Sequence, residues 1–195
     1  HPDLIASLGE LQIPPNHSAL GLPLAGLSMS ASVGRMVTEI GVALESDRPA
    51  LLLVQGDTSS ALAGALAGAL CKIPVGHIEA GLRTFDLSSP WPEELNRRII
   101  GHLASIHFAP TELSRRNLLR EGVDDGTIYV TGNTAVDIVH DWIDTLQIQT
   151  SPPPKDGGTI VVTLHRRESH GTKRLSALRA LLNFLDAHHN FEVRM

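Results

Sequence analysis

The sequence predicts an α/β protein built on a parallel, Rossmann-like sheet. Short apolar runs bounded by Gly or Pro alternate along the chain with longer segments of helical spacing. This alternation is typical of parallel strands joined by crossover helices. In addition, the run 50–55 is apolar up to its last residue, as expected of a strand buried on both faces of such a sheet.

The first half of the chain supplies two helices around that strand. Apolar residues recur at helical spacing over Ser28–Ser46, and Ala50–Gln55 follows as a strand after Pro49. Helix Ala61–Cys71 comes next, preceded by the capping side chains of Asp57–Ser60. Because this helix is rich in Ala and Gly, we expect it to lie close to the sheet.

The next elements repeat the strand and helix alternation. Strands are expected at Pro74–Ile78, Ile106–Ala109 and Thr127–Val130. A helix at Glu112–Glu121 ends before Gly122, and a turn over residues 131–134 caps the helix Ala135–Leu146.

The one Pro/Gly/Ser-rich stretch, 150–158, predicts a linker between two domains. Residues 1–149 then form an N-terminal Rossmann-like domain, and 159–195 begin a second one. Thr159–Thr163, Lys173–His188 and Phe191–Met195 are the expected strand, helix and strand of that second domain. A single βαβ unit cannot cover both faces of its strands, so we expect this domain to be truncated. The start in mid-helix suggests that the N-terminal domain also lacks its beginning.

Composition excludes several function classes. With 195 residues, 42% of them hydrophobic, the chain can bury one good core. Its net charge of −5, with no run of five or more basic residues, argues against nucleic-acid binding. The longest apolar stretch, 61–70, is too short to cross a bilayer. The single cysteine, Cys71, cannot form an internal disulfide, which fits a reducing cytoplasm. Its apolar setting predicts a structural thiol.

Charged side chains concentrate in one loop region, where Glu79, Arg83, Glu93, Glu94 and Arg97 lie among Gly and Pro. The region begins at the end of an apolar strand, and open α/β sheets bind their ligands at the carboxyl ends of strands. Charges are costly to place near a core without a use. The concentration therefore predicts an active site.

Structural alternatives stand beside this interpretation. Asp57 alone is best explained as a helix N-cap, and Glu79 is as well explained by a structural pair with Arg83. For Glu94, a place in the negatively charged first turn of a helix after Pro92 is sufficient. Several carboxylates in one cleft, however, raise each other's pKa, which can make a general acid and a general base from one residue type.

His165 ends a predicted strand and is followed by Arg166 and Arg167, a cluster suited to phosphate or diphosphate oxygens. His77, within an apolar strand, is better explained as a core or supporting histidine. The histidines show no metal-ligand spacing and have no cysteine partners, so no metal site is expected. The fingerprints of dinucleotide-binding, P-loop and serine-hydrolase sites are also missing from the sequence.

Five ordered segments together resemble the non-hydrolysing UDP-N-acetylglucosamine 2-epimerases. These segments are Gln55–Thr58, His77–Thr84, Pro92–Arg97, Val130–Asp137 and Thr163–Ser169. The resemblance covers essentially the whole chain. It implies two Rossmann-like domains in the GT-B arrangement with a UDP-sugar between them, usually as a homodimer, and no NAD or other cofactor.

The resemblance also implies roles for the residues. UDP leaves C1 as the C2 proton is removed, and UDP then adds back while a proton enters C2 from the other face of the glycal. The acid/base and cation-stabilising set is Asp57, Glu79 and Glu93, with the first two as the proton-handling pair, and His165 lies beside the leaving diphosphate. The expected anchors, for substrate or for the carboxylates, are Arg83, Arg97, Arg166 and Arg167, and Asn133 is expected to bind substrate.

Other functions remain open at this point. A hydrolysing relative that releases N-acetylmannosamine and UDP would use the same carboxylates, as would an epimerase of a modified UDP-sugar. The chain could also be an inactive fragment that folds without holding UDP. A glycosyltransferase is a weaker alternative, because an inverting transferase does not need three carboxylates and a histidine around one ring.

Overall fold

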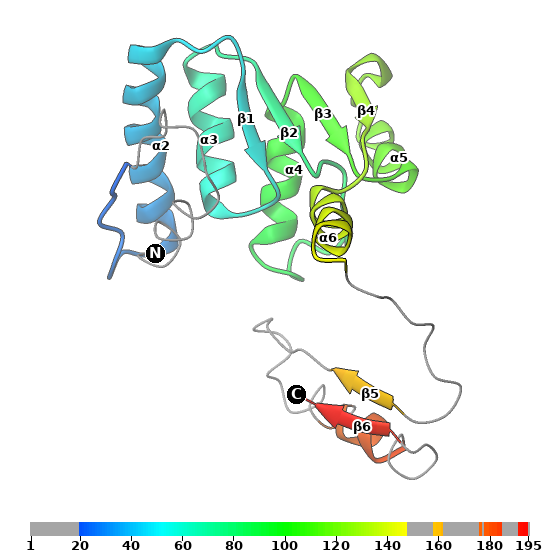
Figure 1. The fold of residues 1–195 in the computed structure, drawn as a ribbon. Coiled ribbons are helices and arrows are strands. Elements are labelled where there is room, and N and C mark those ends of the chain that lie inside the picture. The colour runs from blue at the N-terminus through cyan, green and yellow to red at the C-terminus, as the bar shows by residue number, and fades with distance from the viewer. Residues whose placement is uncertain (1–19, 148–157, 162–175, 177, 185–190, 195) are drawn as a thin grey trace. The chain divides into compact units, whose positions relative to one another are not determined.

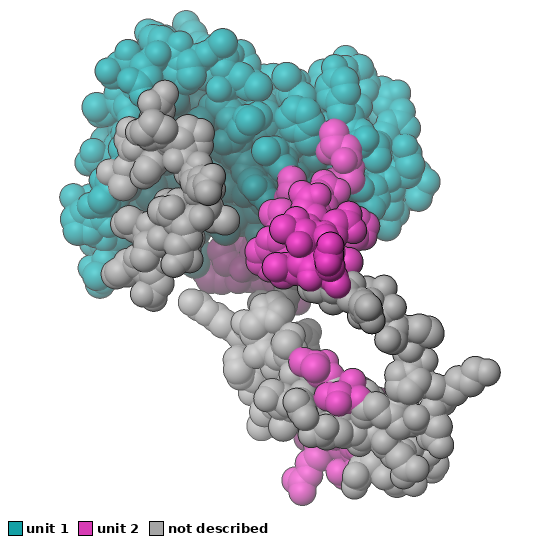
Figure 2. Space-filling model, in the orientation of Figure 1, with its two compact units in different colours: residues 1–82, 96–130 teal, residues 83–95, 131–195 magenta. Residues whose placement is uncertain are grey.

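The computed structural model describes residues 20–147, 158–161, 176, 178–184 and 191–194 (Figure 1). The chain divides into two compact units, coloured separately in Figure 2. Unit 1 comprises His1–Leu82 and Asn96–Val130, and unit 2 comprises Arg83–Leu95 and Thr131–Met195. Each unit is described by itself.

Unit 1 contains a four-stranded parallel sheet in the order β1-β2-β3-β4. Its strands are β1 (Leu52–Gln55), β2 (Val75–Ile78), β3 (Ile106–Ala109) and β4 (Ile128–Val130). These are the four strands that the apolar runs predict in this part of the chain. The predicted class, α/β with a parallel Rossmann-like sheet, is therefore confirmed.

The crossover helices of unit 1 cover one face of this sheet. They are α3 (Ser59–Leu70), α4 (Glu93–Leu103), whose residues from Asn96 onward belong to the unit, and α5 (Glu112–Arg120). Each crossover steps one strand in the same direction, so right-handed connections place the helices on one side. Val54 and Val75 pack there with α3 and Ile100 of α4, and Ala109 and Ile128 pack with Leu118 of α5. In Figure 1, α3 and α4 lie behind β1 and β2.

The opposite face of the sheet retains exposed apolar side chains. Alternation along the strands places Leu53, Phe108 and Tyr129 on this face, and Leu53 and Tyr129 are each 53% exposed. The prediction that the run 50–55 is buried on both faces is therefore wrong for this structure. Among the described residues of unit 1, the helices pack on the side of β1 that carries Val54.

The predicted helices around β1 are confirmed. Helix α2 spans Met29–Asp47, and the side chain of its N-cap Ser28 accepts a hydrogen bond from the Ala31 amide. It packs on α3 through a small apolar cluster that includes Leu44 and Ala67. Helix α3 approaches the sheet closely, since a Cβ placed on Gly68 would lie 2.7 Å from Val75 Cγ2.

The described part of unit 2 contains α6 (Thr134–Thr145), helical residues 176 and 178–184, and a pair of parallel strands. The strands are β5 (Gly158–Val161) and β6 (Phe191–Arg194). Asn133, in the turn 131–134 that is predicted to cap this helix, is the N-cap of α6, and its Oδ1 accepts the Ala135 amide at 2.9 Å. The predicted linker 150–158 lies outside the described residues except for Gly158. Among the described residues, no helix is both long and apolar enough to cross a membrane.

Candidate active site

The turn after β1 is held in place by β2. Strands β1 and β2 are adjacent and parallel, so the residues that follow them meet at the same edge of the sheet. Gly56, with φ +71°, donates its amide to Ile78 O at 3.0 Å. Its carbonyl accepts a hydrogen bond from Nε2 of the fully buried His77 at 2.9 Å. His77 is thus the supporting histidine that its place in an apolar strand predicts.

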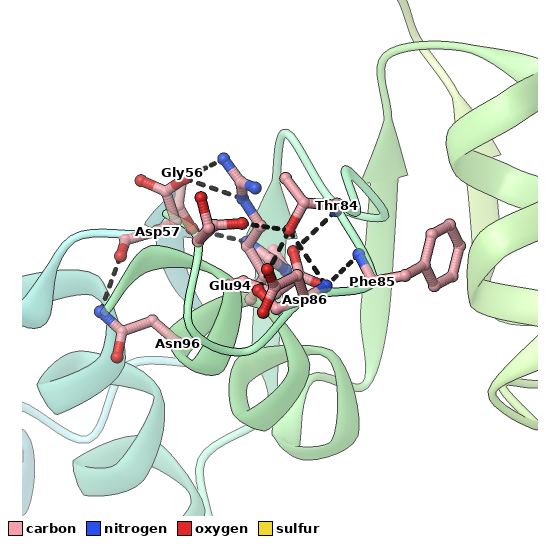
Figure 3. A network of polar contacts seen from close by, with 10 residues as sticks. Gly56, Asp57, Thr84, Phe85, Asp86, Glu94 and Asn96 are labelled. Atoms are coloured by element: carbon pink, nitrogen blue, oxygen red, sulfur yellow. Dashed lines mark hydrogen bonds and ion pairs between the residues drawn. The ribbon is translucent and has the colours of Figure 1, made fainter. Parts of the chain in front are cut away.

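Asp57 is immobilised by two consecutive residues of α4. The Arg97 guanidinium contacts Asp57 Oδ2 through Nε at 2.8 Å and Nη2 at 2.6 Å. The Asn96 side chain donates to the Asp57 carbonyl at 2.8 Å, a bond that Figure 3 shows. The Arg97 side chain is 10% exposed and that of Asp57 is 25% exposed. The carboxylate is therefore fixed in direction yet still reaches solvent.

The N-cap interpretation of Asp57 is wrong. Thr58 is the N-cap of α3, and its side-chain hydroxyl accepts the Ala61 amide at 3.2 Å. A threonine one position later satisfies the orphan amide, which leaves the Asp57 carboxylate to pair with Arg97. Capping of α3 therefore does not explain why the chain has an aspartate at position 57.

Glu79, directly after β2, adopts a left-handed backbone conformation with φ +67°. Such a conformation is uncommon for a residue with a side chain and persists where its surroundings enforce it, often at functional sites. The Ala80 amide donates to Phe108 O at 3.0 Å, and Gly81 lies so close to α5 that a Cβ there would sit 2.3 Å from Ser114 O. These contacts hold the backbone on the C-terminal side of Glu79.

Glu79 reaches the turn that carries Asp57. A Cβ placed on Gly56 would lie 3.4 Å from Glu79 Oε2, so the Glu79 carboxylate approaches the backbone of the residue next to Asp57. Of the predicted carboxylate set, Asp57 and Glu79 belong to unit 1. The approach of Glu79 to this turn is the geometric feature that the structure adds to the candidate site.

Glu93 is the first residue of α4 and belongs to unit 2. Its Oε2 atom is buried and makes no hydrogen bond to any described residue. A buried carboxylate oxygen without a partner is costly, and such atoms in native proteins often have a functional reason. The convergence of Glu93 with Asp57 and Glu79 stays a prediction.

Glu94 lies in the first turn of α4, as predicted, and the structure adds contacts that the sequence does not reveal. Its side chain is completely buried, and its two oxygens accept the amides of Thr84 at 3.0 Å and Phe85 at 3.1 Å. Figure 3 shows these bonds. Glu94 thus binds the beginning of the loop that leads to its own helix.

The remaining predicted residues fall into two groups. Arg83 is half-buried at the start of the loop, and Asn133 caps α6. His165, Arg166 and Arg167 lie outside the described residues, so their roles stay predictions. Within the described ranges, no three His, Cys, Asp or Glu side chains are grouped so that they could hold a metal ion.

Sequence reasoning missed Asn96 as a partner of the Asp57 backbone. The residue is part of the segment Pro92–Arg97, but nothing local indicates that it meets a turn 39 residues earlier. Only the adjacency of β1 and α4 in space reveals the contact. The same applies to the bond between His77 and Gly56, which are 21 residues apart.

Comparison with known proteins gives a consistent result. Residues 4–195 match the family model described as UDP-N-acetylglucosamine 2-epimerase. A relative of that name from Escherichia coli O157:H7 is 42% identical over 184 residues, which cover 89% of this chain and 49% of the relative. A relative of the same name from Yersinia pestis is 42% identical over 181 residues, 87% of this chain and 47% of that one.

Solved structures agree with this match. The UDP-GlcNAc 2-epimerase of Neisseria meningitidis, crystallised with UDP-GlcNAc, superposes with a TM-score of 0.82 at 33% identity, covering 99% of this chain and 54% of that one. The Methanocaldococcus jannaschii enzyme in complex with UDP-GlcNAc and UDP gives 0.75 at 32% identity, covering 96% and 53%. The chain thus spans about half the length of the relatives it matches. By sequence and by fold, the chain belongs to the UDP-N-acetylglucosamine 2-epimerase family.

Proposed function

We propose that this chain carries the proton-handling part of an enzyme that interconverts UDP-N-acetylglucosamine and UDP-N-acetylmannosamine without net hydrolysis. The observation that carries the proposal is that the Glu79 carboxylate, after β2, approaches the turn after β1 that carries Asp57, at the carboxyl edge of a parallel sheet. Family membership supports the substrate, because solved relatives were crystallised with UDP-GlcNAc.

The proposed reaction is an elimination followed by an addition. The C1–O bond breaks and its electron pair leaves with UDP, while a carboxylate removes the C2 proton. A 2-acetamidoglucal and UDP result. UDP oxygen then attacks C1 as a proton is delivered to the opposite face of C2, which inverts that carbon. The C2 proton is not acidic in the ground state, so C1–O cleavage runs ahead and leaves positive character on the ring.

Carboxylates close to the ring suit this chemistry. They stabilise a developing cation electrostatically, and one of them takes the proton. Asp57 and Glu79 are the proposed proton-handling pair, with Glu93 as the third carboxylate. Arg97 and Asn96 hold Asp57 in one orientation, and a preorganised group loses no free energy to reorientation during reaction.

The other proposed contacts concern the nucleotide. Histidine and arginine side chains suit diphosphate oxygens, which supports His165, Arg166 and Arg167 beside the leaving group. Arg83 and Asn133 are proposed to contact the substrate. Arg97 is proposed to anchor the carboxylate of Asp57, with which it forms an ion pair. We also propose that the active species is a homodimer. Each subunit has a second Rossmann-like domain, which the linker 150–158 joins to the N-terminal domain 1–149.

Product analysis tests the proposal. Two polypeptides are incubated separately with UDP-GlcNAc, and the products are followed by ¹H and ³¹P NMR. One is the longest encoded polypeptide that contains this sequence, and the other is the 195-residue chain itself. We expect UDP-N-acetylmannosamine with an intact diphosphate. Accumulation of free N-acetylmannosamine and UDP would instead identify a hydrolysing enzyme. Failure of both polypeptides to convert this substrate or bind UDP would overturn the proposal.

A further inference from the structure

We propose that Glu94 is a positioning residue, which fixes the loop 83–90 and thereby the spacing between Arg83 and Glu93. The inference rests on the proposed function, because it concerns two residues of the predicted site. It adds a role for a carboxylate that the proposed reaction does not use.

The contacts of Glu94 form a two-point clamp. Oε2 accepts the Thr84 amide at 3.0 Å and Oε1 accepts the Phe85 amide at 3.1 Å. Hydrogen bonds to an ionised acceptor are about twice as strong as neutral ones, and consecutive backbone amides form a good site for an anion. Because Glu94 is completely buried, water does not compete at these oxygens.

Burial of its side chain does not explain the backbone conformation of Phe85. Phe85 adopts φ +63° although it carries a side chain, and that side chain is 55% exposed. An aromatic residue adopts a left-handed backbone conformation only where a local contact enforces it. The bond from its amide to Glu94 supplies one.

Further hydrogen bonds connect residues within the loop. The Thr84 hydroxyl donates to Ser89 O at 2.7 Å, and the Ser89 amide donates to Asp86 O at 3.0 Å. The loop is thus a compact unit, and Glu94 attaches it to the first turn of α4 (Figure 3).

This attachment determines the geometry of two candidate site residues. Arg83 directly precedes Thr84, and Glu93 directly precedes Glu94, so the clamp joins the backbone beside each of them. A displacement of about 1 Å at a catalytic group can cost about 100-fold in rate. Loss of the clamp therefore affects the reaction without removing any group that touches the substrate.

The test substitutes Glu94→Gln, which keeps the side-chain volume but turns an NH2 group toward one of the two amides. The matched control is Glu112→Gln, also in the first turn of a helix but exposed, with its side chain 3.6 Å from Arg115. Both variants are made in the longest encoded polypeptide. We expect Glu94→Gln to lower kcat per folded enzyme about 10- to 100-fold, with a smaller change in KM. Glu112→Gln leaves both unchanged.

Hydrogen exchange provides a readout that does not depend on activity. In the unmodified protein we expect the amides of Thr84 and Phe85 to be protected although both residues are exposed, and we expect Glu94→Gln to abolish that protection while protection in β2 persists. Unprotected amides in the unmodified protein would overturn the clamp, whether or not the variant folds. An unchanged kcat in a variant with lost protection would overturn the positioning role. If the unmodified enzyme shows no epimerisation while the amides are protected, the proposed function fails and the clamp stands.

Discussion

Asp57 and Glu94 are both held in a single orientation, but by opposite means. The partners of Asp57 are side chains 39 and 40 residues away along the chain, on another helix. The partners of Glu94 are backbone amides only 9 and 10 residues away, in the loop before its helix. Long-range side-chain pairing thus holds the proposed proton-handling carboxylate, and a local backbone clamp holds the loop beside the site.

The difference predicts different responses to substitution. An ion pair between the turn after β1 and α4 couples the site to the fold, so its loss should affect both activity and stability. A clamp within one loop should affect activity more than stability. The following substitutions test this contrast, from the largest expected effect to the smallest.

The largest effect is expected for Asp57→Asn. Loss of a general acid or base costs about 10²- to 10⁴-fold in rate, and we expect that range for epimerisation of UDP-GlcNAc. Stability should fall less than in Arg97→Ala, because the asparagine oxygen can still accept a hydrogen bond from Arg97. Initial rates and urea unfolding measure the two effects. A variant that keeps a tenth or more of the activity would contradict a proton-handling role.

Arg97→Ala should lower both quantities. It leaves Asp57 without its cation in a partly buried position, which we expect to cost about 2–3 kcal/mol in the free energy of unfolding and about 10- to 100-fold in kcat through a misplaced carboxylate. Arg116→Ala, on the exposed side of α5, is the control. If Arg97→Ala raised KM alone and left stability intact, Arg97 would be a substrate anchor and not a partner of Asp57.

Thr58→Ala should affect stability alone. Removal of an N-cap hydroxyl costs about 1 kcal/mol, and Thr58 caps α3 without contacting the Asp57 carboxylate. Thermal or urea unfolding should show this loss with kcat unchanged. An unchanged stability in Thr58→Ala would contradict the assignment of Thr58 as the N-cap of α3.

The smallest effect is expected for Ser88→Ala in the loop held by Glu94. The Ser88 hydroxyl and then its amide donate to Asp86 and hold the pKa of that carboxyl below its ordinary value of 3.8. A lowered pKa in the folded state stabilises the protein above pH 3.8, and this contribution is lost as the pH falls through the folded pKa. NMR titration of Asp86 should show its pKa move up toward 3.8 in Ser88→Ala, with activity at neutral pH unchanged. A pKa that stays low would assign the effect to the amide alone.

The sequence predicts this fold well because its signals are local. Apolar runs identify β1 to β4, and Ser28 and Asn133 cap the predicted helices α2 and α6. The errors arise where a tertiary contact decides. Asp57 and Thr58 are both good caps by type, and only the presence of Arg97 determines which one caps α3.

The site was predictable as a set of residue types but not as contacts. Carboxylates after β1 and β2 could be expected at one edge of the sheet, because adjacent parallel strands end there together. The buried state of Glu94 could not be predicted, since a glutamate in a first helical turn is normally exposed and sufficiently explained by the helix dipole. Burial depends on the path of the loop 83–90, which the sequence pattern does not specify.

The central claim is that a carboxylate takes the C2 proton during elimination of UDP. Incorporation of hydrogen from the solvent at C2 of the sugar tests this claim most directly. The longest encoded polypeptide is incubated with UDP-GlcNAc in D2O, and the product is analysed by mass spectrometry and NMR. The account predicts one deuterium at C2 of UDP-N-acetylmannosamine formed by the unmodified enzyme. Epimerised product that retains only protium at C2 would contradict it.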